Sequence, residues 1–166
     1  MRIAICFYGL VGSKDKKYGK GTPLDPQVCY NYYKKNVFFN DHELDIFIHS
    51  QSYESKDKIL KVYNPKLYLI EKQKNFFLKT LFHKKIIYEF FSLPIKFLLK
   101  KKKLKELILD LNKKYLRCLN LWSRWYSTKK VIDLKKKYEK ENNFKYDLVM
   151  LTRFDLAFLT KFNFDD

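Results

Sequence analysis

Short apolar runs separated by helical patterns make up most of the chain. The first run, Ile3–Tyr8, ends at Gly9, and a continuous apolar run of this length predicts a strand buried on both faces. Further runs are centred on Ile46–Ile48, lie within residues 66–73 and cover Asp147–Leu151. Strands that alternate with helices predict an α/β fold with an open, mostly parallel, Rossmann-like sheet flanked by helices.

Two helices are expected between the first three strands. Asp25 can cap the first of them, with Pro26 at its first position. Three residues then recur at helical spacing: Val28, Tyr32 and Lys35. The second helix begins after Ser55 and ends before Pro65, because the residue before a proline disfavours the helical conformation.

The middle of the chain, about residues 76–121, breaks this alternation and is helical and strongly basic. We interpret it as a helical insertion in a single domain that spans residues 1–166. Pro94 should kink or split it. Beyond Leu104, one helical stripe is expected to pack into a core, with the members Leu107, Ile108, Leu111, Tyr115, Leu116 and Leu119.

A separate helix is expected after the segment "WSRWYS", with Val131, Leu134 and Tyr138 facing inward and Asn142–Asn143 at its end. Ser127 or Thr128 could cap this helix. Ser123 and Arg124 would then lie where a helix N-terminus can bind an anion. The alternative is that "WSRWYS" forms an aromatic packing corner.

The composition gives a formal net charge of +17, from 35 lysine and arginine residues against 18 acidic ones. Only four of the basic residues are arginine. A basic surface attracts phosphate-bearing partners such as nucleic acid, anionic lipid or a nucleotide. The alternative is a compositional bias of an AT-rich coding sequence. Scarce arginine argues against reading of DNA bases, and three widely spaced cysteines argue against a disulfide framework and indicate a cytoplasmic protein.

Candidate chemistry lies at the carboxyl ends of the strands, where open parallel sheets bind ligands. The first strand ends at Tyr8 and Gly9, and Gly12 and Ser13 follow; this is either a ligand-binding loop or an ordinary turn. His49 ends the second strand and could contact a base, a phosphate or a metal, or serve as a structural histidine. The third strand end, residues 71–73, carries the weakest signal.

The most informative stretch is "YDLVMLTRFDLAFLT", in which Arg153 and Asp155 interrupt an apolar strand. Their spacing places both side chains on one side of the strand end. An arginine there can grip a diphosphate, and an aspartate can hold a divalent cation. The alternative is an Arg–Asp salt bridge; we favour the ligand because the apolar flanks leave only these two groups polar. The sequence shows no GxSxG or HExxH motif, paired-carboxylate spacing or Cys–His pairing, which argues against a hydrolase that depends on a nucleophilic serine or cysteine.

Several of these motifs together resemble glycosyltransferase-like proteins of bacterial surface-polysaccharide clusters and large viruses. The matching residues are Gly9, Asp45 to His49, Tyr126–Ser127, Tyr146–Asp147, and Arg153 with Asp155. The resemblance implies a GT-A-like fold, in which the strand that bears the acidic motif lies next to the first strand. Asp155 would then lie close to the Gly9 loop. The acceptor half of such enzymes lies downstream, so we expect this chain to be the N-terminal part of a longer enzyme.

The function that this resemblance implies is transfer of a sugar from a nucleotide-sugar donor to a glycan or lipid-linked acceptor in polysaccharide biosynthesis. Arg153 and Asp155 would hold the diphosphate, with Arg124 as a further anion contact, and the Gly9–Ser13 loop and His49 would line the nucleoside. Many GT-A enzymes bind Mn²⁺ or Mg²⁺ through Asp-x-Asp; this chain has Arg-x-Asp instead, and Arg153 could itself neutralise part of the diphosphate charge.

The alternative function is a non-catalytic basic module. The basic and aromatic stretch Phe76–Lys103 could lie on an anionic membrane, as a peripheral attachment to its inner face, or bind nucleic acid. A third interpretation is an amphipathic helical pair that covers one face of the sheet with solvated lysines.

Overall fold

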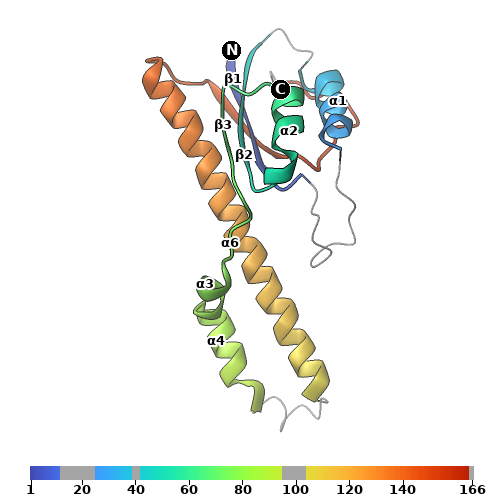
Figure 1. Ribbon diagram of the computed structural model, residues 1–166, viewed down its shortest axis with the longest axis vertical. Coiled ribbons are helices and arrows are strands. Elements are labelled where there is room, and N and C mark those ends of the chain that lie inside the picture. Colours follow the sequence, from blue (N-terminus) through green and yellow to red (C-terminus); the bar gives the residue numbers. More distant parts are fainter. Residues whose placement is uncertain (12–24, 39–41, 95–103, 165–166) are drawn as a thin grey trace. The chain divides into compact units, whose positions relative to one another are not determined.

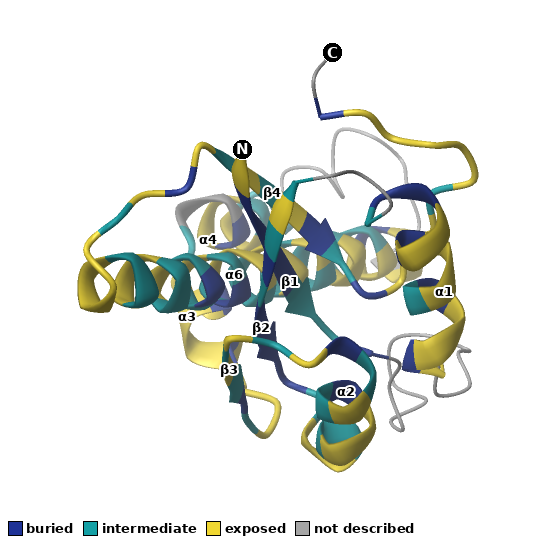
Figure 2. Ribbon diagram, turned by 90° about the horizontal axis from the view of Figure 1, so that it is seen from above, coloured by how far each residue is buried: buried dark blue, intermediate teal, exposed yellow. Residues whose placement is uncertain are grey.

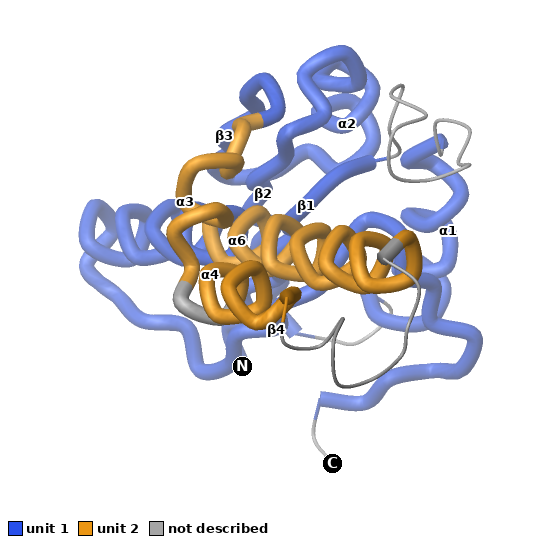
Figure 3. The backbone as a smooth tube through the Cα atoms, turned by 90° about the horizontal axis from the view of Figure 1, so that it is seen from below, with its two compact units in different colours: residues 1–73, 127–166 blue, residues 74–126 orange. Residues whose placement is uncertain are grey.

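The computed structural model describes residues 1–11, 25–38, 42–94 and 104–164. The chain divides into two compact units: Met1–Gln73 together with Ser127–Asp166, here called the sheet unit, and Lys74–Tyr126, here called the helical unit (Figure 3).

The sheet unit contains four parallel strands in the order β3-β2-β1-β4 (Figure 1). Their bounds are β1 (Arg2–Gly9), β2 (Glu43–Ser50), β3 (Leu67–Ile70) and β4 (Leu148–Arg153). The predicted open α/β sheet and the positions of its four strands are confirmed. The third strand is shorter than expected, and the fourth extends two residues further, to Arg153. β1 is central and its residues from Ile3 to Phe7 are completely buried, as Figure 2 shows.

One face of the sheet is covered by α1 (Pro26–Asn36) and α2 (Lys56–Tyr63), and the short 3-10 turn η1 (Tyr53–Ser55) precedes α2. The ring of Phe7 from β1 is central to this core, and its centroid lies 4.9 Å from that of Tyr33, 4.7 Å from that of Tyr63 and 5.4 Å from that of Phe154. Edge-on and stacked aromatic contacts of this kind add stability beyond the buried area.

The N-terminus of α1 is as predicted, because the Asp25 side chain accepts a hydrogen bond of 3.0 Å from the N–H of Gln27. The buried face of α1 is shifted by one residue from the face that the spacing of Val28 and Tyr32 indicated. Val28 and Tyr32 are exposed, whereas Cys29, Tyr33 and Asn36 are buried. Adjacent tyrosines make both stripes apolar, so periodicity alone could not choose between them.

The other face is covered by the C-terminal part of α6 (Leu104–Glu141). Val131 is buried there against Ala4, Cys6 and Phe47, and Leu134 and Tyr138 pack beside it, as predicted. The helix ends just before Asn142–Asn143, also as predicted, and Asn143 has a left-handed backbone with φ of 54°.

The expected helix break at "WSRWYS" is wrong. α6 is one continuous helix of 38 residues, so Ser127 and Thr128 are not caps. The physical reason is that the sequence between Leu104 and Glu141 has neither glycine nor proline, and nothing in it stops a helix.

The helical unit contains α3 (Phe77–Leu81), α4 (Lys84–Phe91) and the part of α6 up to Tyr126. As expected, α4 ends before Pro94. The stripe predicted on α6 is only partly correct, since Leu107 is buried but Ile108 is exposed. None of the helices in the described residues is both long and apolar enough to cross a bilayer.

Candidate functional site

The carboxyl ends of β1 and β4 lie side by side, and Tyr8 is the register partner of Arg153. The strand that bears Arg153 and Asp155 is thus the neighbour of the first strand, as expected from the resemblance. From β1 the chain winds through β2 to β3 on one side, and then returns to place β4 on the other side. The gap between β1 and β4 is therefore the topological switch point, where open parallel sheets bind their ligands.

Arg153 is the last residue of β4, and Asp155 lies in the turn that follows. The two side chains form a two-pronged ion pair: Arg153 Nε donates to Asp155 Oδ1 at 2.8 Å, and Nη2 donates to Oδ2. The side chains are 41% and 32% exposed. The salt bridge considered as the alternative in the sequence is therefore present, but at the sheet edge and not in the core. An exposed pair contributes only about 0–1 kcal/mol, so a stronger anion can replace Asp155 as the partner of Arg153.

Arg153, Tyr8 and His49 form one row across the carboxyl ends of β4, β1 and β2, since both other residues are register partners of Tyr8. All three side chains point to the face covered by α6. Tyr8 packs in that core, His49 follows Phe47 of that core by two positions, and Arg153 follows Thr152, which is bonded on the opposite face. Three of the residues singled out from the sequence are thus brought together.

His49 is fully buried, and its Nε2 lies 3.2 Å from Oε1 of Glu71. In this conformation the imidazole does not reach solvent, which favours the structural interpretation of His49. Glu71 is 22% exposed and is the member of the pair open to a ligand. Sequence analysis gave Glu71 little weight. The signal was a carboxylate directly after β3, the strand that neighbours β2 and its His49.

The turn after β1 is tied to the end of β2 by two serines that sequence reasoning missed. Ser50 donates through Oγ to the carbonyl of Gly9 at 2.9 Å, and the Oγ of Ser52 accepts the N–H of Val11 at 2.8 Å. Gly9 has φ of 105°, which favours glycine, and a Cβ there would meet no atom of the described residues within 4 Å. The described residues therefore leave space beside this turn. Gly12 and Ser13 lie outside the described residues.

The backbone of Arg153 is held by α1. The hydroxyl of Tyr33 lies 2.5 Å from Oγ1 of Thr152 and donates to the carbonyl of Arg153 at 3.2 Å. Burial raises the pKa of Tyr33 to about 12, so the hydroxyl keeps its proton at physiological pH. The strand end is therefore fixed while the Arg153 side chain stays accessible.

Arg124 does not have the setting that the sequence predicted. It lies inside α6, within the helical unit, so its neighbouring N–H groups are part of a continuous helix and form no anion-binding N-terminus. Ser127 does belong to the sheet unit and is buried, one turn before Val131 on the same face of α6.

The donor set at this edge does not fit a divalent cation held by the protein. Asp155 is a single carboxylate and already pairs with a guanidinium, whereas Mg²⁺ and Mn²⁺ need several oxygen ligands. In the described part of the chain, no group of three or more His, Cys, Asp or Glu side chains could hold a metal ion.

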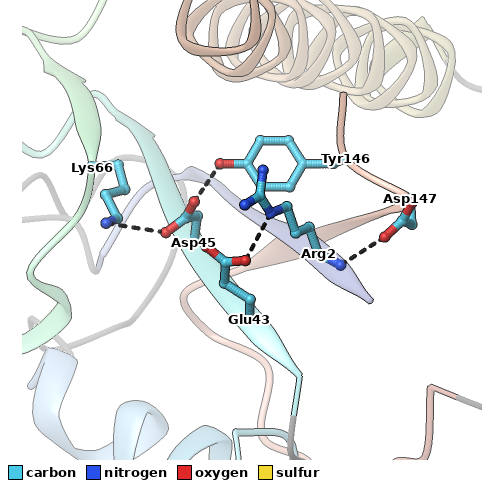
Figure 4. A network of polar contacts seen from close by, with 6 residues as sticks. All are labelled: Arg2, Glu43, Asp45, Lys66, Tyr146 and Asp147. Carbon is cyan, nitrogen blue, oxygen red and sulfur yellow. Dashed lines mark hydrogen bonds and ion pairs between the residues drawn. The ribbon is translucent and has the colours of Figure 1, made fainter. Parts of the chain in front are cut away.

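Three further residues of the resemblance, Asp45, Tyr146 and Asp147, lie at the opposite, amino end of the sheet (Figure 4). Tyr146 donates from its hydroxyl to Oδ2 of the buried Asp45 at 2.5 Å, and Lys66 Nζ lies 3.4 Å from Oδ1. Asp147 accepts the N–H of Arg2 at 2.7 Å. Burial, together with the bond to Asp45, raises the pKa of Tyr146. These motif residues join the starts of three strands, so their role is structural.

No protein-family model, curated protein or solved structure matches this chain.

Proposed function

We propose that the sheet unit binds the diphosphate of a nucleotide-sugar at the adjoining carboxyl ends of β1 and β4, and that the protein transfers the sugar to a glycan or lipid-linked acceptor. The observation that carries the proposal is the register pair Tyr8–Arg153, which sets an accessible guanidinium beside the open Gly9 turn at the switch point. A GT-A-like arrangement of the sheet is part of the same proposal.

Arg153 is the diphosphate-binding group. A guanidinium presents a planar fork that matches two phosphate oxygens, and Asp155 already occupies that fork with the same two-pronged geometry. A diphosphate carries more negative charge than one carboxylate and can displace Asp155. During transfer, negative charge grows on the leaving nucleoside diphosphate, and a fixed cation there stabilises it.

Asp155 acts as a positioning residue. It holds the guanidinium in one orientation before the donor arrives, so less side-chain freedom is lost on binding. Glu71 follows β3, two strands away from β1 and roughly 10 Å from it by strand spacing, where a ribose hydroxyl or a base N–H can reach it.

The first test is calorimetry of the purified chain with UDP-, GDP- and dTDP-sugars, and with CMP-sugars, which have only one phosphate. We expect binding of a diphosphate donor without Mn²⁺. The Arg153→Gln variant should bind at least tenfold more weakly, because charge-assisted hydrogen bonds contribute about 1.5–3 kcal/mol. Arg117→Gln is the matched control, since it removes the same charge from an exposed position of α6.

The Asp155→Asn variant separates the two roles of the carboxylate. If Asp155 only positions Arg153, the Asp155→Asn variant should keep a donor affinity within a few fold of wild type. A loss of tenfold or more that appears only with Mn²⁺ would make Asp155 a metal ligand and overturn its assignment. Absence of binding to every diphosphate donor, or equal binding of CMP-sugars, contradicts the proposed site. Sugar transfer is measured as the release of nucleoside diphosphate after an acceptor is added. Donor binding without this release contradicts transferase activity of this chain.

A further inference from the structure

The helical unit exposes a dense group of large apolar side chains on α3, on α4 and between them. The most exposed are Phe82 at 75% and Phe91 at 73%. The group, here called the α3–α4 apolar surface, consists of Phe77, Leu78, Leu81, Phe82, Ile87, Tyr88, Phe90 and Phe91. Single exposed apolar residues are normal, but eight within residues 77–91 mark an interaction surface.

A small apolar hollow lies within this surface. It measures about 240 Å³, and all of its lining residues are apolar: Leu81, Ile86, Ile87, Phe90 and Phe91. A hollow of this kind accepts a hydrocarbon group and offers no hydrogen bonds to a polar ligand.

The charge of the same unit identifies the kind of partner. Residues 74–126 contain 14 lysine and arginine residues and three acidic residues, which gives +11 of the total charge of +17. Glu89 is the only acidic residue between Lys74 and Lys105, and its Oε1 lies 2.5 Å from Lys114 Nζ. The helical unit therefore combines exposed aromatic rings with a large excess of positive charge.

A second copy of this chain fits the surface poorly, because each copy would bring the same +11. A nucleic acid satisfies the lysines but has no apolar interior for Leu78 and for the side chains that line the hollow. An anionic bilayer satisfies both, since phenyl and leucyl groups enter the region below the headgroups while lysines meet the lipid phosphates. Short helices that lie in the interface match this mode, and no described helix is able to span the bilayer.

We propose that the α3–α4 apolar surface attaches the protein to anionic membranes, with its aromatic side chains inserted beneath the headgroups and the lysines of the helical unit against them. The inference does not rest on the proposed sugar transfer, because all of its residues belong to the helical unit. The sequence-based suggestion for Phe76–Lys103 is here assigned to residues 77–91; residues 95–103 lie outside the described part.

The test is flotation of the full chain with vesicles of phosphatidylcholine alone or with 30% phosphatidylserine, at about 50 mM and 500 mM salt. The wild-type protein should float with the anionic vesicles at low salt, and at least tenfold less with neutral ones. The double variant Phe82→Asn with Phe91→Asn should lower the partition coefficient at least tenfold. The matched control, Tyr32→Asn with Tyr53→Asn, alters two exposed rings of the sheet unit and should bind as wild type does.

Three outcomes overturn the inference. Absence of wild-type flotation with anionic vesicles at low salt rules out membrane attachment. Flotation that salt abolishes but the Phe82 and Phe91 variant retains means that only charge is involved. Binding of duplex RNA or DNA without flotation would assign the surface to nucleic acid instead. Circular dichroism of the double variant checks that the helices are intact.

Discussion

At the scale of single residues, the ionised groups that matter differ in how firmly they are held. Arg153 and Asp155 form a partly exposed pair that a ligand can separate. The Glu139 side chain is only 13% exposed and accepts three hydrogen bonds from two residues. Both carboxylate oxygens of Glu139 lie 2.9 Å from Lys135 Nζ, and Oε1 accepts the N–H of Tyr146 at 3.0 Å. Glu139 thereby connects α6 with the segment that enters β4.

This network predicts a pH-dependent contribution to stability. Burial by itself would raise the pKa of Glu139, but the hydrogen bonds from Lys135 and Tyr146 outweigh it and lower the pKa below its ordinary value of 4.5. A lowered pKa in the folded state means that the stabilisation is complete above about pH 4.5 and is lost as the pH falls through the folded value. Glu139→Gln should reduce the free energy of unfolding by about 1–2 kcal/mol at pH 7.

Urea unfolding of wild type and Glu139→Gln between pH 3 and 7 measures this effect. The gap between the two proteins should shrink below about pH 4.5. Glu141→Gln is the matched control, because its carboxylate is exposed and lies 3.8 Å from Lys137; its effect should stay under about 0.5 kcal/mol. A constant gap at all pH values would contradict the role of the ionised carboxylate.

At the scale of elements, α6 is the least expected feature. The sequence around Ser127 carries plausible capping residues, yet the helix continues through it. A capping residue is a permissive signal: serine and threonine also occur inside helices when packing or helix length favours continuation.

A proline at position 128 distinguishes a helix that begins at Ser127 from a continuous α6. If a helix began at Ser127, Thr128 would be the first helical residue and would tolerate proline. Within a continuous helix, Thr128→Pro should destabilise the protein by about 3 kcal/mol or more, measured by urea unfolding and loss of helical circular dichroism. Thr128→Ala provides the comparison, and a proline variant within about 1 kcal/mol of it would refute the continuous helix.

At the scale of the whole molecule, the structural contacts and the proposed ligand site lie at opposite ends of the strands of the sheet unit. The amino end carries the Asp45–Tyr146 bond and the Arg2 contacts, whereas the carboxyl end carries the accessible side chain of Arg153. Changes at the two ends should therefore have different consequences.

Removal of one hydroxyl tests this separation. Tyr146→Phe leaves the buried Asp45 without a donor at Oδ2, which should cost about 1–3 kcal/mol in urea unfolding. Its nucleotide-sugar affinity should remain that of wild type in calorimetry. Tyr32→Phe removes the same group from an exposed ring of α1 and should change neither quantity. A tenfold loss of affinity in Tyr146→Phe would show that the two ends are coupled.

Local pattern predicted the four strands, the Asp25 cap and the end of α6, because each of these depends on neighbours in the sequence. It could not choose between Tyr32 and Tyr33 as the inward residue, since only the packing around Phe7 decides that. The contacts His49–Glu71 and Ser52–Val11 depend on which strands become neighbours. The adjacency of β1 and β4 was expected only from the resemblance, since periodicity carries no information on strand order.

Among the described strands, β4 has a neighbour on one side only, and its Val149 and Leu151 are exposed. A strand edge with apolar side chains is a template for pairing between molecules, and so a source of aggregation. The charge of +17 opposes this, because copies of the protein repel one another at low ionic strength. At a salt concentration of 0.1 M, the repulsion between charges more than about 10 Å apart is largely screened. The colloidal stability of this protein should therefore fall as salt is added, which makes dilute buffer the safer storage condition.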